Sequence, residues 1–218
     1  MKLSDIVLTP VLSAPFQENG YVLHCKNKTD CIVIDPGLEP GLFLELFEKK
    51  GLTPIAILVT HGHGDHIGGI TMIRKKWKSA KIYIGEFEYE KLTDPEQNLS
   101  AALGIGLMTP KADFLLKDGE KLDLAGISIE VLHVPGHSRG HVVYHIPTEP
   151  KGMLFVGDVI FQGSIGRSDF FDSDPSVQMP MIRSKVLSLP DDTTIYPGHG
   201  GSTTVGIERL SNPFLKCG

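Results

Sequence analysis

The sequence predicts an α/β fold in which β-sheets pack together and helices lie outside them. Short runs rich in valine, isoleucine and leucine alternate with amphipathic helical patterns along the chain. The run IAILVT at 55–60 is continuously apolar, as is typical of a strand buried on both faces. Several expected strands end in glycine beside histidine or aspartate, and strand ends are where open α/β sheets hold ligands.

Composition sets limits on the class of protein. The chain has 218 residues with 41% hydrophobic and 22% charged side chains, enough for one large core or two small ones and too apolar for a disordered chain. A net charge of −5 argues against a broad nucleic-acid surface, although a local basic patch stays open. No apolar run approaches the roughly 20 residues of a membrane span, and the N-terminus lacks a signal-peptide core. We therefore expect a cytoplasmic protein.

The first half of the chain contains most of the expected strands. Strands are expected at 6–12, 20–25, 31–35, 55–60 and 81–85. Helices are expected at 42–51, 67–77 and, for the most part, 86–104. In the first of these helices Phe43 and Phe47 share one face, and Gly51 is placed to end it. Asp94 and Pro95 form a plausible cap and first-turn pair for the third.

The second half repeats the alternation without a detectable sequence repeat or low-complexity linker. Strands are expected at 127–134, 141–146, 153–158 and 193–200, and helices at 174–189 and 203–210. Pro180 must kink or split the first of these helices, because proline lacks the amide hydrogen that the helix interior needs.

The three cysteines do not form a disulfide scaffold. Their count is low and odd: Cys25, Cys31 and Cys217. Cys25 and Cys31 flank the turn-like KNKTD and could face each other across a hairpin, but reduced buried thiols are the commoner state and the preferred interpretation.

The segment HGHGDH at 61–66 carries the clearest chemical signal. It places three of the nine histidines and one aspartate within six positions, directly after the apolar strand. A polar loop without a task is the alternative. Titratable groups this close would destabilise one another without a partner cation, so the segment predicts metal binding.

Three further strand ends repeat the signal. They are Pro-Gly-His at 135–137, Gly-Asp at 157–158 and Pro-Gly-His at 197–199. Imidazole and carboxylate are common ligands of zinc and iron, and the six or seven donors are too many for one tetrahedral ion and suit two. The remaining histidines are interpreted as ordinary surface or core residues: His24, His133, His141 and His145.

These strings together resemble the metallo-β-lactamase superfamily. The resemblance rests on IDPG at 34–37, THGHGDH at 60–66, PGHSRGH at 135–141, FVGDVIFQGSIGRSDF at 155–170 and IYPGHG at 195–200. More narrowly, GSIGRSDF and YPGHGGSTTVGIERLSNPFL are similar to the short glyoxalase II-like (hydroxyacylglutathione hydrolase-like) hydrolases.

The resemblance implies an αββα four-layer sandwich with metals at one edge of the two packed sheets. It also implies one domain over 1–218 without the C-terminal helical extension that helps glyoxalase II hold glutathione. The first metal would be bound by His61, His63 and His137, the second by Asp65, His66 and His199, with Asp158 bridging both. Asp35 would support the site from outside.

The implied activity is hydrolysis of S-D-lactoylglutathione or related hydroxyacyl thioesters through a metal-bridging hydroxide. Two divalent ions would be needed, zinc by preference, with iron or manganese as alternatives. The catalytic residues would be Asp65, Asp158 and Arg167, the last as an anion contact. Arg139 either reaches a substrate carboxylate or points to solvent. The expected partner is a small-molecule thioester, with neither nucleic acid nor membrane, and the protein would be a monomer or small homo-oligomer.

Other functions fit parts of the pattern. A persulfide dioxygenase would use one iron held by His61, His137 and Asp158, and GRSDF at 166–170 is close to a string of that branch. A nuclease would need a basic stripe, which the acidic balance disfavours. A metal-binding scaffold without activity would not need all seven ligand positions.

Overall fold

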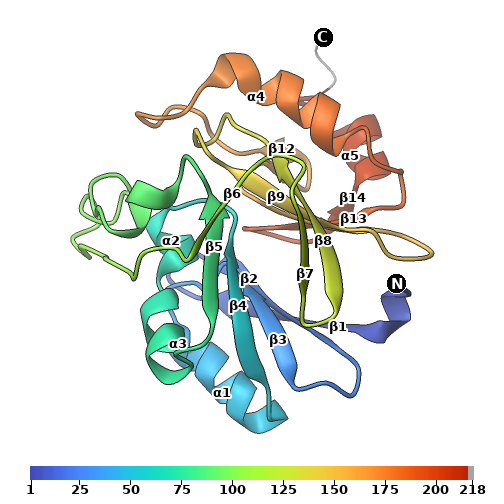
Figure 1. Ribbon diagram of the computed structural model, residues 1–218. Helices are drawn as coiled ribbons and strands as arrows, with labels where there is room; N and C mark the ends of the chain where they lie inside the picture. Colours follow the sequence, from blue (N-terminus) through green and yellow to red (C-terminus); the bar gives the residue numbers. More distant parts are fainter. Residues whose placement is uncertain (216–218) are drawn as a thin grey trace.

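The computed structural model describes residues 1–215 and has a six-stranded sheet in its N-terminal half (Figure 1). The strands are β1 (Ile6–Ser13), β2 (Glu18–Cys25), β3 (Asp30–Ile34), β4 (Thr53–Val59), β5 (Lys81–Gly85) and β6 (Phe114–Leu116), in that order across the sheet. The pairs β1–β2 and β2–β3 are antiparallel, and β3 to β6 run parallel. The parallel part places the ends of β4 and β5 at the same edge.

The second sheet also has six strands. Their order is β14 (Thr203–Thr204), β13 (Thr194–Pro197), β10 (Met153–Gly157), β9 (Val142–Ile146), β8 (Ile127–His133) and β7 (Lys121–Leu124). Only β10 and β13 pair in parallel, so these two strands end side by side. A small hairpin follows β10 and consists of β11 (Ile160–Phe161) and β12 (Ser164–Ile165).

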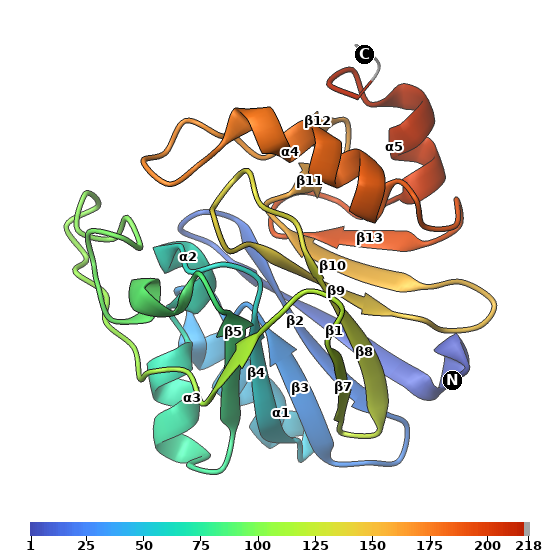
Figure 2. The same cartoon turned by 45° about the horizontal axis from the view of Figure 1, so that its top comes forward.

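Helices cover the outer faces of both sheets (Figures 1 and 2). The first sheet is covered by α1 (Pro40–Lys50), α2 (Gly64–Ile67) and α3 (Ile70–Lys76). The second is covered by α4 (Pro175–Met181), the π-helix Ile182–Val186 and α5 (Val205–Ser211). Two single-turn 3-10 helices lie at Leu3–Asp5 and Tyr89–Leu92. The expected αββα arrangement is therefore confirmed.

Side-chain alternation in β4 shows how the layers are held. Leu58 points into the core between the two sheets, where it meets Tyr144 and Phe155 of the second sheet. Ile57 and Val59 point the other way, into the core under α1 and α3. Both faces of β4 are buried, as its continuous apolar run indicates. A third core lies between the second sheet and its own helices.

The helix expected over 86–104 is wrong. Only the 3-10 turn Tyr89–Leu92 is regular there, and a looped segment follows. Leu99 has a left-handed backbone at φ 66°, which a continuous helix cannot contain. The side chain of Asn98 donates to the carbonyls of Lys91 and Leu107, so it closes the loop on itself. In this segment, hydrogen bonds between distant residues outweigh the local preference for a helix.

Two other helices are interrupted. The segment expected as one helix over 67–77 is divided into α2 and α3 by Gly68 and Gly69, where a Cβ would collide with the backbone of Pro36 to Leu38. Beyond Pro180, α4 gives way to the π-helix, which confirms that this proline splits the helical segment.

Five short strands were not predicted from the sequence. The strands β6, β7, β11, β12 and β14 have two to four residues and were not expected, because so few residues carry little periodic signal. Cys25 and Cys31 are buried free thiols on opposite faces of the first sheet, one in the core between the sheets and the other under the helices. Cys217 lies outside the described residues.

Within 1–215 the chain has no helix of the length and apolarity needed to cross a membrane.

Two buried tyrosines join the sheets by hydrogen bonds. The hydroxyl of Tyr144 in β9 donates to the carbonyl of Val59 in β4 over 2.7 Å. The hydroxyl of Tyr21 in β2 donates to the carbonyl of Pro197 in β13 over 2.6 Å. Both acceptors stand at the strand ends that lead into the histidine motifs, so these bonds fix the edge at which the motifs meet.

We predict that Tyr144→Phe lowers the free energy of unfolding by about 1 kcal/mol, because it removes one buried hydrogen bond with little change of volume. The melting temperature should fall by about 2–4 °C in calorimetry for a chain of this size. Tyr83→Phe is the control, since the Tyr83 hydroxyl has no hydrogen bond within the described residues. Equal effects of the two substitutions would contradict the role assigned to Tyr144.

Candidate metal centre

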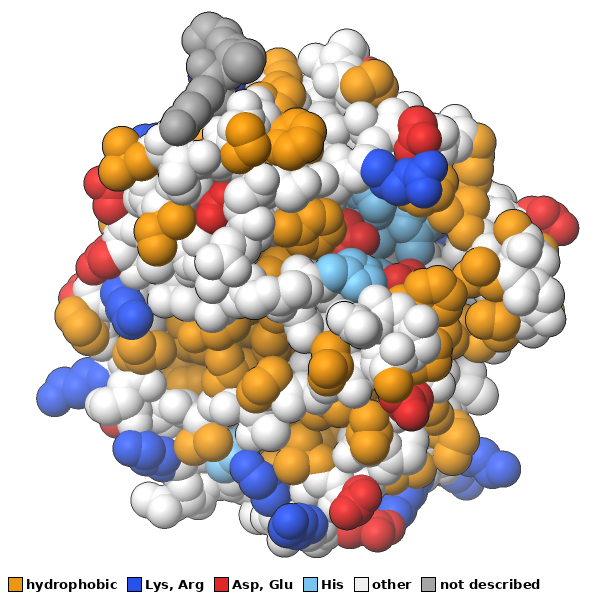
Figure 3. Space-filling model, turned by 180° about the vertical axis from the view of Figure 1, so that it is seen from behind, with side chains coloured by type: hydrophobic (Ala, Val, Ile, Leu, Met, Phe, Trp, Pro, Cys, Tyr) orange, Lys and Arg blue, Asp and Glu red, His pale blue; other side chains and the backbone are white. Residues whose placement is uncertain are grey.

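The predicted histidine and aspartate side chains meet at one edge of the sandwich. Each of the motif segments follows the end of a strand: HGHGDH follows β4, His137 follows β8, Asp158 follows β10 and His199 follows β13. The surface there is hollowed, and imidazole and carboxylate groups line the hollow among hydrophobic side chains (Figure 3). All seven candidate ligands predicted from the sequence lie in this region.

Three histidines form a first cluster. The Nε2 atom of His61 lies 3.0 Å from Nδ1 of His63 and 3.3 Å from Nε2 of His137. The third side of the triangle, from Nε2 of His137 to Nδ1 of His63, is 3.1 Å. The three rings are buried and meet edge to face.

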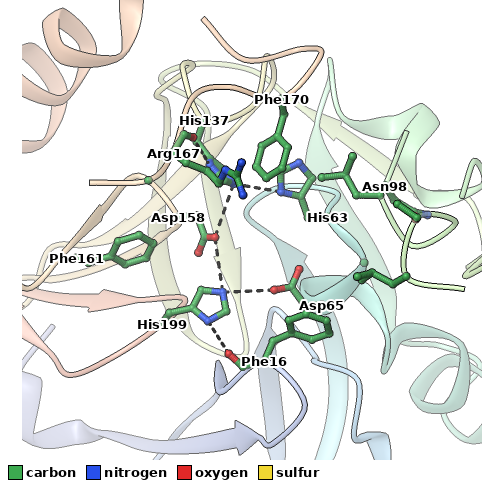
Figure 4. A pocket seen from close by; sticks show the side chains of 15 residues that line it. Phe16, His63, Asp65, Asn98, His137, Asp158, Phe161, Arg167, Phe170 and His199 are labelled. Carbon is green, nitrogen blue, oxygen red and sulfur yellow. Dashed lines mark hydrogen bonds and ion pairs between the residues drawn. The ribbon is translucent and has the colours of Figure 1, made fainter. Parts of the chain in front are cut away.

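Asp65, His66 and His199 form a second cluster. Oδ2 of Asp65 lies 3.3 Å from Nε2 of His199 and 3.9 Å from Nε2 of His66. His66 is fully buried, whereas the side chains of Asp65 and His199 are partly exposed. Figure 4 shows these two side chains facing each other in the wall of the cavity. This cluster therefore opens to the surface on one side.

Asp158 lies between the two clusters. Its Oδ2 atom is 3.6 Å from Nε2 of His137 in the first cluster and 3.6 Å from Nε2 of His199 in the second. Its Oδ1 atom is 3.4 Å from Nε2 of His66. One carboxylate thus touches members of both clusters, as a bridging ligand would.

The donor set fits divalent metal ions. Nitrogen ligands placed 2.0–2.1 Å from a tetrahedral zinc lie about 3.3 Å from one another, close to the spacing in the first cluster. Nε2 of His66 and Oδ1 of Asp158 are buried and lack a hydrogen-bond partner among the described residues. Buried polar atoms without partners are costly, and a bound cation would satisfy both. The residues present therefore suit one cation in each cluster.

Burial keeps the first cluster neutral. It lowers the pKa of His61 and His63 well below the ordinary value, and the neighbouring histidines lower both further. Burial also lowers the pKa of His137, although Asp158 opposes the shift. Neutral imidazoles present free lone pairs near neutral pH, which is the form that binds metal.

The second cluster has the opposite electrostatics. Burial lowers the pKa of His66, but Asp65 and Asp158 outweigh it and hold the pKa well above the ordinary value. For Asp158, burial raises the pKa, and the adjacent charged His66 outweighs it and makes the carboxyl strongly acidic. The pKa of His199 is likewise raised, because Asp65 and Asp158 outweigh its burial. The two carboxylates therefore favour positive charge at this cluster, whether on protonated histidines or on a bound divalent cation.

A model of the family matches residues 13–199, and its description is "Metallo-beta-lactamase superfamily". The matched segment contains both clusters. The chain belongs to the metallo-beta-lactamase superfamily. This membership supports a metal-dependent hydrolase, and it confirms the resemblance of the motifs to this superfamily.

Curated members of the superfamily are similar over nearly the whole chain. The "Probable metallo-hydrolase YqgX" of Bacillus subtilis is 38% identical over 203 residues, which cover 93% of this chain and 94% of that protein. The "Hydroxyacylglutathione hydrolase GloC" of Haemophilus influenzae is 39% identical, with 97% and 98% covered. The chain is also similar to the Aeromonas salmonicida hydroxyacylglutathione hydrolase, 34% identical, but spans 64% of its length.

Solved superfamily structures share the architecture. BLEG-1, described as a B3 metallo-beta-lactamase, superimposes with a TM-score of 0.91 at 37% identity, covering 96% of this chain and all of that one. TTHA1623, solved in a di-iron-bound form, gives a TM-score of 0.80 at 38% identity, with 95% and 100% covered. The Myxococcus xanthus protein ETHE1 gives 0.77 at 20% identity and is similar in fold.

Asp35 holds the start of the superfamily's histidine motif in place. It stands at the end of β3 with a left-handed backbone, φ 46°. Its Oδ1 accepts the backbone amide of Thr60 at 2.7 Å, and its Oδ2 accepts the Thr60 hydroxyl at 2.6 Å. The same Oδ2 lies 3.1 Å from Nδ1 of His66. Asp35 therefore orients the ring whose other nitrogen faces Asp158, which is the outer support expected from the sequence.

A glycine lets the second sheet approach this motif. Gly157 has φ +47°, and a Cβ there would lie 2.3 Å from the Thr60 hydroxyl and 2.9 Å from the ring of His141. The close approach delivers Asp158 to the cluster, and only glycine combines the positive φ with the missing side chain.

His141 is a site residue that sequence reasoning missed. It was interpreted as ordinary, yet its buried ring stacks on His61 with centroids 4.6 Å apart and 17° between planes. Its Nε2 atom accepts the backbone amide of Asp158 over 3.2 Å. The only available signal was its place at the end of PGHSRGH, at the start of β9. His141 orients one ligand and steadies the backbone of another.

A cavity of about 750 Å³ opens over the two clusters (Figure 4). Its walls are mainly apolar: Phe16, Leu99, Ala102, Leu103, Phe161 and Phe170. The ring of Phe170 packs edge-on against His63 and His137, with centroids 5.0 and 5.6 Å apart. The carbonyl of Phe16 lies 3.1 Å from Nδ1 of His199. The looped segment after Tyr89–Leu92 thus supplies one wall of the cavity.

The two arginines considered from the sequence differ in position. Arg167 lines the cavity, lies over the ring of Phe170 and makes a two-bond ion pair with Asp169 at 2.6 and 2.7 Å. Arg139 is exposed outside the cavity wall, over the ring of Phe87. Arg167 is therefore placed to meet a substrate, and Arg139 is not.

We predict that Asp35→Asn weakens divalent metal binding at the second cluster about 10- to 100-fold, the usual cost of losing an outer partner of a ligand. Asparagine tolerates the left-handed backbone, so the fold should persist. Zinc affinity of the apo-protein, measured by competition with a fluorescent chelator, tests this. Asp30→Asn, on the exposed end of β3, is the control, and an unchanged affinity in Asp35→Asn would refute the role.

Proposed function

We propose that this protein is a metal-dependent thioesterase that hydrolyses S-D-lactoylglutathione or related hydroxyacyl thioesters. The observation that carries the proposal is the pair of ligand clusters joined by Asp158 at the base of an apolar cavity. We assign His61, His63 and His137 to one ion, Asp65, His66 and His199 to a second, and Asp158 to both. Zinc is the preferred metal, with iron or manganese as alternatives.

The similar proteins support this choice. The Haemophilus influenzae relative is a hydroxyacylglutathione hydrolase of nearly the same extent as this chain. TTHA1623 was solved in a di-iron-bound form, which favours two ions and keeps iron in consideration. BLEG-1 is described as a metallo-beta-lactamase, so cleavage of a β-lactam ring is a second activity worth assaying.

When bound, two divalent cations supply an ionisable water and polarise the thioester carbonyl. The chain contributes the geometry. The neutral imidazoles of the first cluster present lone pairs, and the carboxylates of Asp65 and Asp158 balance positive charge. The phenyl rings on the cavity wall cover part of the clusters from water and so strengthen electrostatic interactions on that side. A thiol leaving group needs no general acid, because its ordinary pKa is only about 8.5.

We retain the expectations that residues 1–218 form one domain, that the protein is cytoplasmic, that it acts on a small molecule with neither nucleic acid nor membrane, and that it is a monomer or small homo-oligomer. The continuous apolar core between the two sheets supports the first of these. The others rest on composition and net charge.

The alternative is a persulfide dioxygenase with one iron held by His61, His137 and Asp158. These side chains lie within reach of one another, at 3.3 Å between Nε2 of His61 and Nε2 of His137 and 3.6 Å between Nε2 of His137 and Oδ2 of Asp158. One iron per chain with oxygen consumption on glutathione persulfide would favour this function. Two metals per chain with thioester cleavage favour the thioesterase.

We predict that protein purified without added metal contains close to two divalent ions per chain and hydrolyses S-D-lactoylglutathione. His63→Ala and Asp158→Ala should each lower kcat/KM at least about 100-fold, because each leaves a cation short of a ligand. Elemental analysis and the release of free thiol are the measurements. His24→Ala, remote from the clusters in β2, is the control and should retain activity. A metal-replete wild-type protein inert toward all thioesters would refute the proposal.

We predict that Arg167→Ala raises KM for thioesters that carry a carboxylate, by about 5- to 20-fold, with little change in kcat. The guanidinium is one of the polar groups on the cavity wall, and its ion pair with Asp169 occupies only Nε and one terminal nitrogen. Steady-state kinetics on a carboxylate-bearing and a neutral thioester measure the difference. Arg139→Ala is the matched control, and an unchanged KM in Arg167→Ala would remove this role.

A further inference from the structure

We propose that Glu88 is a positioning residue for the first metal ion, because its one carboxylate joins the two loops that supply His61, His63 and His137. This inference rests on the metal site of the proposed function, but not on the identity of the substrate. Glu88 follows the end of β5, where a turn closed by its amide on the carbonyl of Gly85 carries it under the first cluster. Its side chain is completely buried.

Both carboxylate oxygens bind donors from the ligand loops. Oε2 accepts the amide of Gly62, the residue between His61 and His63, over 2.8 Å. Oε1 accepts the hydroxyl of Ser138 over 2.8 Å and the amide of Gly140 over 2.8 Å, both in the loop of His137. Every partner is a donor, so the site needs an acceptor-only group. A carboxylate meets that need and a neutral amide does not.

The glycines in the two motifs allow this approach. A Cβ on Gly62 would lie 2.5 Å from Cβ of Lys91, and a Cβ on Gly140 would lie 2.7 Å from the backbone of Phe87 and 2.8 Å from Glu88 itself. Both loops therefore pack directly on the turn that carries Glu88. The glycine between the two histidines of HGH has a physical reason that metal ligation alone does not give.

Lys91 compensates the buried charge. Its Nζ lies 3.0 Å from Oε2 of Glu88 and 2.6 Å from Oδ2 of Asp172, and its side chain is only 3% exposed. Asp172 also accepts the amide of Arg139 over 3.3 Å. The Glu88–Lys91–Asp172 chain thus connects the ligand loops to the segment that carries Phe170. A buried carboxylate is tolerable here because it is paired and fully hydrogen-bonded.

Within the ligand loops, Glu88 accepts hydrogen bonds only beside ligands of the first cluster. The donors are Gly62, Ser138 and Gly140, which adjoin His61, His63 and His137, whereas Asp35 supports His66 of the second cluster. Loss of Glu88 should therefore weaken one metal site selectively. A side chain that merely stabilised the fold would affect both sites alike.

The test measures zinc affinity in two backgrounds that isolate the clusters. His199→Ala leaves the first cluster intact, and His63→Ala leaves the second. Adding Glu88→Gln to the first background should weaken zinc binding about 10- to 100-fold, the cost typical of an outer ligand partner. Adding it to the second should change zinc binding less than about threefold. Chelator competition on the apo-proteins gives both values without an activity assay.

Glu90→Gln is the matched control, because Glu90 is exposed on the same 3-10 turn and should leave both affinities unchanged. If Glu88→Gln does not fold, Ser138→Ala replaces it, since it removes one donor to the carboxylate and should weaken the first site about threefold or more. Equal losses in the two backgrounds, or no loss in the first, would overturn the proposal. A protein that binds two zinc ions in this manner but cleaves no thioester would refute the proposed function alone.

Discussion

The contact of Asp158 with both histidine clusters is the interaction on which the site depends. It comes from the second sheet, and its carboxylate lies within 3.6 Å of His66, which the first sheet supplies, and of His137 and His199. The two sheets can present such a group only if their strand ends meet at one edge. The tyrosine hydrogen bonds from Tyr144 and Tyr21 act at this edge. The packing of the two sheets therefore determines where the candidate metal ligands lie.

Gathering these groups costs free energy that the surroundings must offset. Burial lowers the pKa of His61, His63 and His137 and removes water from the carboxyl groups of Asp65 and Asp158. Two carboxylates outside the clusters offset part of this cost by accepting hydrogen bonds from the HGHGDH segment and the residue before it. Asp35 accepts the amide of Thr60, and Glu88 accepts the amide of Gly62. Each acts through backbone amides, so the ligands are oriented by the chain itself and not only by the ion.

Much of the fold followed from pattern. The apolar run of β4, the face shared by Phe43 and Phe47, and the interruption at Pro180 all depend on short-range physics, and the structure agrees with them. The helix predicted over 86–104 is wrong for a reason that short-range pattern does not contain. Its composition suits a helix, but the hydrogen bonds of Asn98 and the left-handed Leu99 fold it into a cavity wall. Tertiary contacts of that kind leave no periodic trace in a sequence.

Some residues of the candidate site could likewise be predicted from the sequence, and others could not. The seven proposed ligands could be named because they lie in glycine-containing motifs at strand ends. His141, Glu88 and Lys91 could not, because each acts on a partner that is distant in sequence: His141 on the amide of Asp158, Glu88 on Gly62 and Gly140, and Lys91 on Asp172. A lone glutamate in a charged turn looks like any surface residue. Only the three-dimensional convergence of donors identifies it.

The two clusters differ in charge, and this difference determines which of two bound cations would polarise a substrate group more strongly. Three neutral imidazoles and the shared carboxylate of Asp158 surround the first position, so an ion there would keep more of its positive charge than an ion at the second position. Asp65 and Asp158 surround the second, which is also the more exposed. An ion with fewer anionic ligands polarises a bound group more strongly, and the first ion would have only the shared Asp158, whereas the second would have Asp65 as well. The more electrophilic position would then lie against Phe170 on the apolar side of the cavity, and the charge-balanced position on the open side, next to His199 and Phe16.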